Sequence, residues 1–381
     1  MSRRLLARVV SVGVAAVVVA AASGCQQKVD RPADVPPVHL QAAATIKAPK
    51  TGAYTGVFTP PAPFEMTYVD DYAQKAGRSP SIVMWFQPWV EKGSSRFDKA
   101  AVVSVLQRGC VPMITWEPWD PGNDANLLRE PAKQSAYRLK RINDGEFDAY
   151  IRSWAKAAKE LGGPVMIRPM HEMNGNWYPW CGSANGNQPE EYRKAWRHIV
   201  DIFDKEGATN VTWVWSINRE SVPDANDNSF AAYYPGDAYV DWTSISGFNW
   251  GTSRPSTQWT SFSELYEAPL AYLRTVGKPI VLSEFGCVPD GGDKAAWIAD
   301  AYGVIKKHPE IDAVIYYDKL EQGLKLTQDW RISSSKKSEA AYKAAIADTY
   351  YLSSTPPELE QWGNGLSQTQ WTYLRTIQPV Y

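Results

Sequence analysis

The sequence contains few of the residues that bind metals or form disulfide frameworks. It has four cysteines and four histidines in 381 residues, and neither CxxC nor HExxH occurs. Structural and catalytic zinc sites need such ligands at close spacing, so we predict no metal site. The motifs GxGxxG, GxxxxGK[ST] and GxSxG are also absent, which argues against a dinucleotide site, a phosphate-binding loop and a nucleophile elbow. We therefore expect a protein without a cofactor.

The chain also lacks an excess of either charge. Its 40 basic and 41 acidic residues give a formal net charge of −1, and no polybasic run is present. This balance argues against a nucleic-acid partner. A hydrophobic content of 44% over this length is enough for a large core. We expect one globular catalytic domain that acts as a monomer.

No apolar run is long enough for a confident membrane-spanning helix, since the longest covers only Val9–Ala20. This run follows three arginines and precedes the small residues Ala22–Cys25, as in a signal peptide over residues 1–25. The end resembles a bacterial lipobox, which would make Cys25 the lipidated residue of a membrane-anchored lipoprotein. Ordinary secretion with cleavage near Cys25 is the alternative, and both place the domain outside the cytoplasm. Residues 26–50 are rich in Pro and Ala and are interpreted as a spacer.

Strand and helix patterns alternate over residues 51–350. Eight apolar, β-branched or aromatic runs predict strands at Tyr54–Phe58, Ile82–Phe86, Pro112–Trp116, Val165–Pro169, Val211–Ile217, Ser244–Phe248, Ile280–Glu284 and Ala313–Tyr317. Amphipathic helical patterns lie between them, which is typical of a (β/α)8 TIM barrel of the α/β class. A doubly wound open sheet is the rival, but its glycine-rich phosphate turn is missing. Residues 351–381 are expected to form an extension packed on the barrel.

Two predicted strands end in glutamates. The first leads into PVMIRPMHEMNGNWYPWCG (residues 164–182), which contains Glu172 and several aromatic side chains, and the second, KPIVLSEFG (residues 278–286), ends near Glu284. Catalytic groups of such barrels lie at the carboxyl ends of the strands, so both acids face one end. A carboxyl pair is what glycoside hydrolysis requires. The alternative is that both are structural carboxylates at the rim, paired with Arg168 or another cation.

These motifs resemble those of glycoside hydrolase family 26. The resemblance rests on RPMHEMNGNWYPW and VLSEFG, with ITWEPWD before them and DWRISSS after them. It implies a retaining enzyme with Glu172 as general acid/base and Glu284 as nucleophile, and it places His171 and Trp177 at the cleavage subsite. The chain departs from the family pattern at Phe248, where many relatives have Tyr, and at Tyr316-Tyr317, where relatives often have Trp.

The full set of predicted substrate-binding residues is His171, Trp177, Glu117, Trp116, Asn249, Trp250 and Tyr316. Indoles near the strand ends favour a β-1,4-linked polysaccharide substrate, which the resemblance narrows to β-mannan first and mixed-linkage β-glucan second. An envelope polysaccharide stays open, as does a surface glycan-binding lipoprotein without turnover. Cys181 and Cys287 follow the fourth and seventh strands, so a disulfide that braces the two catalytic loops is a further hypothesis.

Overall fold

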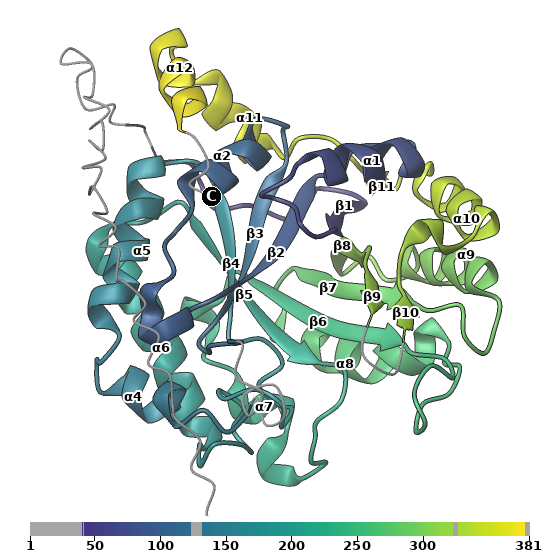
Figure 1. The fold of residues 1–381 in the computed structure, drawn as a ribbon, viewed down its shortest axis with the longest axis horizontal. Helices are drawn as coiled ribbons and strands as arrows, with labels where there is room; N and C mark the ends of the chain where they lie inside the picture. Colours follow the sequence, from purple (N-terminus) through teal and green to yellow (C-terminus); the bar gives the residue numbers. More distant parts are fainter. Residues whose placement is uncertain (1–39, 41, 123–131, 323–326, 378–381) are drawn as a thin grey trace, which may run out of the picture. The chain divides into compact units, whose positions relative to one another are not determined.

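Eight parallel strands form a closed barrel in the computed structural model, which describes residues 40, 42–122, 132–322 and 327–377. Each strand pairs with its neighbours in sequence, and β1 also pairs with β8, which closes the sheet (Figure 1). The strands are β1 (Ala53–Phe58), β2 (Ile82–Pro88), β3 (Val111–Glu117), β4 (Val165–Pro169), β5 (Val211–Asn218), β6 (Trp242–Asn249), β7 (Ile280–Cys287) and β8 (Ile311–Tyr317). Every predicted strand lies within an observed one, so the predicted (β/α)8 barrel is confirmed.

Helices connect the strands and lie outside the barrel (Figure 1). The long ones are α1 (Thr67–Ala76), α2 (Lys99–Leu106), α5 (Asp148–Leu161), α6 (Pro189–Glu206), α8 (Phe262–Val276), α9 (Lys294–Ile305) and α10 (Lys336–Ile346); α4 (Leu139–Asn143) and α7 (Phe230–Tyr233) are short. Local sequence sets their ends. Ser261 and Glu264 form a capping box at the start of α8, and Gly277 ends it with φ 71°. Among the described helices, none combines the length and apolar character that a membrane crossing needs.

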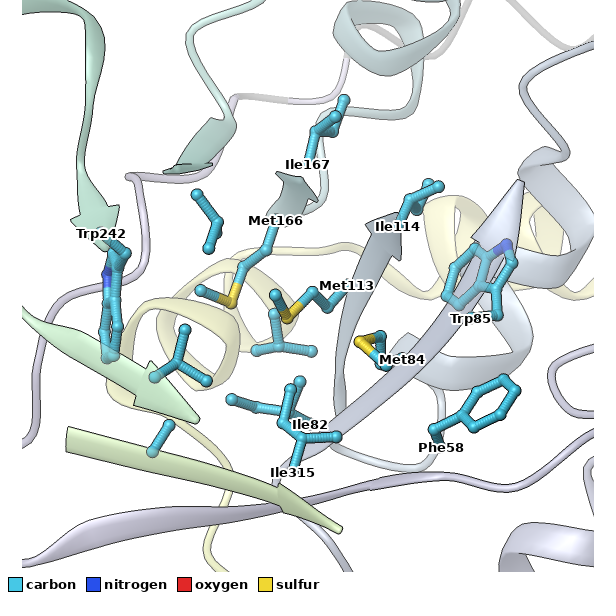
Figure 2. Packing of buried hydrophobic residues seen from close by; sticks show 14 of the residues in the cluster. Phe58, Ile82, Met84, Trp85, Met113, Ile114, Met166, Ile167, Trp242 and Ile315 are labelled. Carbon is cyan, nitrogen blue, oxygen red and sulfur yellow. The ribbon is translucent and has the colours of Figure 1, made fainter. Parts of the chain in front are cut away.

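The barrel interior is apolar toward the amino ends of the strands. Side chains of Ile82, Met84, Met113, Met166 and Ile315 converge there (Figure 2), and each is at most 1% exposed. A β-carbon on Gly56 would lie 2.9 Å from Ile315, so this glycine gives the larger neighbours room. Close packing of this layer supports the polar layer above it.

Residues 42–50 pack against the amino ends of the strands. The Ala43 amide donates to the Gly162 carbonyl, and the Ile46 amide donates to the Thr212 hydroxyl, both at 2.8 Å. Trp242 donates to the Ile46 carbonyl, and Ile46 is 1% exposed. This part of the segment therefore belongs to the domain, unlike the spacer predicted for residues 26–50. Residues 1–39, with the predicted signal peptide and Cys25, lie outside the described residues.

The C-terminal extension packs at the same amino end. Strand β11 (Tyr351–Leu352) pairs in parallel with the start of β1. Helices α11 (Pro357–Asn364) and α12 (Gln368–Thr376) follow. Trp362 of α11 is buried near Gly163, which precedes β4 in the sequence. The extension is thus remote from the carboxyl ends of the strands, where the site lies.

The insert of residues 120–144 lies between β3 and α5, and the structure describes its residues 120–122 and 132–144. Its Gln134 carbonyl accepts a hydrogen bond from Asn185 at 2.7 Å, and its Leu139 amide donates to Asn187 at 3.1 Å. Both asparagines belong to the connection that follows β4. The insert therefore lies at the carboxyl end of the barrel.

Candidate active site

A buried arginine occupies the polar layer inside the barrel. Arg168 on β4 has no exposed surface, and its Nη2 donates to Glu284 Oε1 at 2.7 Å. Its other donors reach the hydroxyls of Thr115, Ser216, Ser246 and Ser283, which lie on β3, β5, β6 and β7. Small hydroxyl residues at these interior positions leave room for the guanidinium and satisfy its N–H groups. The charge of Arg168 is thereby compensated by one carboxylate held in a fixed place.

An irregularity in β7 brings that carboxylate to Arg168. Successive residues of a regular strand point to opposite faces, yet both Ser283 and Glu284 contact the guanidinium. The pairing of β6 with β7 shifts register here, because Ile245 pairs with Leu282 while Ser246 pairs with Glu284. Such β-bulges redirect side chains and occur often beside active sites.

The backbone at Glu172 is held in an unusual conformation. Met170 and Glu172 have φ of 48° and 55°, in the left-handed region that costs non-glycine residues of the order of 1–3 kcal/mol each. Their amides donate to carbonyls of the neighbouring strands, at Trp116 and Ser216. The turn directs the Glu172 side chain into the cleft, where Trp177 Nε1 donates to its Oε2 at 2.8 Å.

Glu172 and Glu284 form a close pair. One oxygen of each carboxyl group and one ring nitrogen of His171 all lie within 4.8 Å of one another. Burial, reinforced by the negative charge of Glu284, raises the pKa of Glu172 to about 7, although the Trp177 hydrogen bond acts in the opposite direction. Glu172 can therefore hold a proton near neutrality, while Glu284 lies against the cation Arg168. The two carboxyl groups thus lie in different electrostatic environments, which is what an acid and a nucleophile in one site require.

Glu117 and His171 form a second, neutral pair behind the first. Burial raises the pKa of Glu117 to about 8, and burial lowers the pKa of His171 well below its usual value. His171 Nδ1 lies 4.0 Å from Glu117 and Nε2 lies 3.8 Å from Glu284. These contacts are too long for hydrogen bonds, and the one to Glu117 joins two neutral groups rather than an ion pair. Both ring nitrogens are buried without a hydrogen-bond partner among the described residues.

Two cavities meet at Glu284. The first, of about 450 Å³, is lined by both catalytic candidates and by Trp177, Phe248, Trp250 and Trp330. The second, of about 560 Å³, contains Glu284 and Glu117 but not Glu172, and its wall includes Phe58, Trp85, Phe86 and Trp119. Tyr178, Tyr317 and Glu321 belong to both walls. Together the cavities form one cleft with aromatic walls across the carboxyl end of the barrel.

Four of the seven predicted substrate-binding residues lie at this cleft or directly behind it. Trp177, Trp250 and Glu117 line it, and His171 lies behind Glu284 without exposed surface.

Trp116, Asn249 and Tyr316 lie elsewhere, each fully buried and outside both cavity walls. Trp116 stacks on Trp154 of α5 at 4.5 Å, and Tyr316 packs against Tyr342 of α10 at 5.0 Å. Strand alternation explains both, because the cleft-facing residues are their neighbours, Glu117 and Tyr317. Asn249 accepts hydrogen bonds from the Gly251 and Thr260 amides and so shapes the loop after β6. We therefore do not retain these three as substrate contacts.

The hypothesis of a disulfide between Cys181 and Cys287 is wrong for this structure. Both cysteines, and also Cys110, are free and buried. The Cys181 thiol donates to the Glu172 carbonyl at 3.5 Å, whereas the Cys287 thiol donates to the Val288 carbonyl at 3.1 Å. Each thiol is thus used within its own loop.

Several residues of the site were not among the predicted site residues, and Arg168 was considered only as a structural partner of the two acids. The signal for Arg168 was present in the sequence, since a charged residue in the buried run VMIRP needs a partner. Tyr317 could have been predicted by working out which alternate residues of β8 point into the barrel. Trp330 and Glu321 follow β8 in the hairpin of β9 (Leu320–Gln322) and β10 (Thr327–Asp329), and no periodicity in the sequence indicates it.

Comparison with known proteins agrees with this geometry. The model of glycosyl hydrolase family 26 matches residues 69–271. Endoglucanase H of Acetivibrio thermocellus is 37% identical over 301 residues, which cover 78% of this chain and 30% of that protein. A mannan endo-1,4-beta-mannosidase of Bacillus subtilis is 26% identical over 205 residues, covering 49% of this chain and 55% of that protein. The chain thus spans only part of the length of these curated relatives.

Solved structures share the fold. The catalytic domain of a family 26 endo-β-1,4-mannanase from Bacillus sp. JAMB-750 superposes with a TM-score of 0.60 at 18% identity, covering 85% of this chain and 98% of that one. A modular endo-β-1,4-mannanase from Cellulomonas fimi gives 0.59 at 17% identity, covering 84% and 79%. A barrel with two carboxyl groups at the carboxyl ends of its strands is the arrangement found in glycoside hydrolases. The family match is more specific, and the chain belongs to glycosyl hydrolase family 26.

We expect the Arg168–Glu284 ion pair to contribute to the stability of the fold. Arg168→Met should lower the free energy of unfolding by about 3–5 kcal/mol, because it leaves a buried carboxylate without its cation. Urea denaturation measures this loss. Arg152→Met is the matched control, since Arg152 pairs with Asp148 at the surface with 42% of its side chain exposed, and should cost less than about 1 kcal/mol. Adding Glu284→Gln to Arg168→Met should recover part of the loss, and no recovery would contradict this explanation.

The raised pKa of Glu172 makes a prediction for pH dependence. A general acid must be protonated, so kcat/KM should fall as the pH rises through an apparent pKa of about 7. The Trp177 hydrogen bond stabilises ionised Glu172, so Trp177→Phe should raise this pKa and move the alkaline limb to higher pH. Trp250→Phe removes a cleft indole without a hydrogen bond to either acid and should leave the limb in place. A shift to lower pH in Trp177→Phe would oppose the assignment.

Proposed function

We propose that this protein is a retaining β-glycanase that cleaves a β-1,4-containing glucan, with Glu284 as nucleophile and Glu172 as general acid/base. The observation that carries the proposal is the carboxyl pair with oxygens within 4.8 Å. Retaining enzymes place the two carboxyl groups about 5–5.5 Å apart, whereas inverting enzymes need about 6.5–9.5 Å to admit a water molecule. Membership in the family supports the same mechanism.

In the first step, Glu284 attacks the anomeric carbon and forms a glycosyl ester, while Glu172 gives its proton to the departing glycosidic oxygen. In the second step, ionised Glu172 takes a proton from water, whose oxygen attacks the anomeric carbon and releases Glu284. Arg168 holds the nucleophile in place through both steps, because its other hydrogen bonds tie it to four strands. The negative charge of Glu284 is lost when the ester forms. This loss lowers the pKa of Glu172 and favours its ionised form, which the second step needs.

A glycan-binding protein without turnover is the competing class. Binding alone requires aromatic platforms and hydroxyl partners, which Trp177, Trp250 and Trp330 could supply. It does not require a carboxyl group kept protonated beside an ion-paired carboxylate. The paired acids therefore favour an enzyme over a binding protein.

Substrate choice depends on the hydroxyl at carbon 2, the one position at which mannose and glucose differ. Glu117, protonated near neutrality because burial raises its pKa to about 8, can donate a hydrogen bond to it, and neutral His171 supports the same wall. The sequence motifs place β-mannan ahead of mixed-linkage β-glucan. The greater identity to a protein named endoglucanase, 37% against 26% for a mannosidase, supports the reverse order, which we adopt with β-mannan second.

Loss of the nucleophile tests the mechanism. Glu284→Ala should lower kcat by several orders of magnitude on every substrate, because no glycosyl ester can form. NMR of the wild-type reaction should show the β-anomer as the first product. Wild-type rates in the variant, or the α-anomer formed first, would refute the double displacement.

A polysaccharide panel tests the substrate. Values of kcat/KM on matched mixed-linkage glucan and mannan oligosaccharides should favour the glucan. A higher kcat/KM on the mannan oligosaccharide would instead put β-mannan first, as the sequence motifs favour. Negligible rates on both, with activity on the cell's own envelope polysaccharide, would reject both polymers.

We also propose a lipid anchor at Cys25, supported by the lipobox-like sequence Ala22–Cys25. Stable attachment needs more than one acyl chain, as in bacterial lipoproteins. Cys25→Ser should move the protein from the membrane fraction to the medium or block its processing. Mature wild-type protein found only in the medium, with an unmodified N-terminus beyond Cys25, would exclude the anchor.

A further inference from the structure

Glu321 is a charged residue of the cleft that the catalytic mechanism does not use. It lies on β9, in the hairpin that follows β8, and 28% of its side chain is exposed. Its carboxylate lines both cavities, a position it shares with Glu284, Tyr178 and Tyr317. A polysaccharide that runs through the cleft must therefore pass Glu321.

Three donors fix the orientation of this carboxylate. Tyr317 donates to Oε1 at 2.8 Å, Lys319 donates to Oε1 at 3.1 Å, and Trp330 donates to Oε2 at 3.2 Å. Burial raises the pKa of Glu321, but Lys319 and the hydrogen bonds outweigh it and hold the pKa below its usual value. A carboxylate has about four acceptor positions, so this anion keeps acceptor capacity, mainly on Oε2.

The donors of Glu321 also belong to an aromatic surface. Tyr317 packs on Phe58 at 4.6 Å and on Phe248 at 5.1 Å, and Trp330 packs on Phe248 at 4.8 Å. A pyranose that stacks on aromatic rings directs its hydroxyls outward, roughly in the plane of the sugar ring. Polar acceptors are then needed at the edge of the platform, and Glu321 provides one.

The cavities indicate which part of the substrate Glu321 meets. The acid Glu172 faces the leaving group, and the nucleophile Glu284 faces the sugar that is retained as the glycosyl ester. The second cavity contains Glu284 but not Glu172, so it holds the retained, glycone side. Glu321 lines this cavity beside Glu284 and Tyr317.

We infer that Glu321 is a specificity-determining residue that accepts a hydrogen bond from a hydroxyl on the glycone side of the cleaved bond. This inference rests on the proposed function, because it assigns Glu321 to the substrate of the same site. The alternative is a purely structural role, in which Glu321 only holds Tyr317 and Trp330 in place.

Deoxy substrates separate the two roles. The values of kcat/KM are measured for wild type and Glu321→Gln on the polymer-derived oligosaccharide that the wild type hydrolyses, and on analogues that each lack one glycone hydroxyl. In wild type, removal of the bound hydroxyl should cost about 10- to 100-fold, the factor expected for a hydrogen bond to a charged group. In Glu321→Gln the intact substrate should lose a similar factor, and the deoxy analogue should lose little more.

Glu310→Gln is the matched control. Glu310 precedes β8 at the opposite end of the barrel, has 24% of its side chain exposed and is bound by Arg274 and His308. It should leave both kcat/KM values unchanged. Thermal denaturation of all variants checks that they are folded.

The outcomes distinguish this inference from the proposed function. If Glu321→Gln loses the same factor on the intact and on every deoxy substrate, Glu321 is structural and the inference is overturned. If glucan is not hydrolysed but another polymer is, the substrate proposal fails, and the comparison on that other polymer still decides the role of Glu321. A protein that hydrolyses no polymer and binds none in calorimetry overturns both.

Discussion

The ion pair between Arg168 and Glu284 is the interaction on which the site depends. A guanidinium without exposed surface must find a partner for its charge and acceptors for its N–H groups. One carboxylate and four hydroxyls from four other strands meet that need. The barrel interior therefore cannot be apolar throughout, and its packed methionine and isoleucine layer gives way to a polar layer just below the cleft.

This arrangement also separates the properties of the two acids. Glu284 lies against a cation, whereas Glu172 stands on a turn of left-handed backbone and receives one indole hydrogen bond. Burial and the charge of Glu284 keep the Glu172 proton in place near neutrality. Glu117 and His171, both neutral, complete the wall without adding a further charge. Glu172, Glu284 and Glu117 thus lie close together without forming three adjacent anions.

Much of this could be predicted from the sequence because strand patterns and strand-end acids are local features. The eight strands, the location of Glu172 and Glu284 at one end, and the position of Trp250 near a strand end follow from such patterns, whereas the cleft position of Trp177 was implied by the resemblance to the family. Three side chains were misplaced, namely Trp116, Asn249 and Tyr316. Each is one residue away from a cleft residue, because a strand run shows that residues are buried but not which face they take. The bulge at Ser283, the turn at Glu172 and the β9–β10 hairpin depend on tertiary contacts that have no periodic signal. Cys181 and Cys287 share one end of the barrel, but common location does not supply the geometry of a disulfide.

The central claim is that Glu284, held by Arg168, forms a covalent ester with the substrate sugar during turnover. It is tested most directly by incubating the enzyme with a 2-deoxy-2-fluoro glycoside that has a reactive leaving group and the sugar of the preferred polymer. Fluorine destabilises the charge that develops in both transition states, while the leaving group keeps the first step fast enough for the ester to accumulate. Peptide mass spectrometry of the inactivated protein should then find one sugar on the peptide that contains Glu284, at that residue. A label on Glu172, on Glu117 or on any other residue would contradict the account.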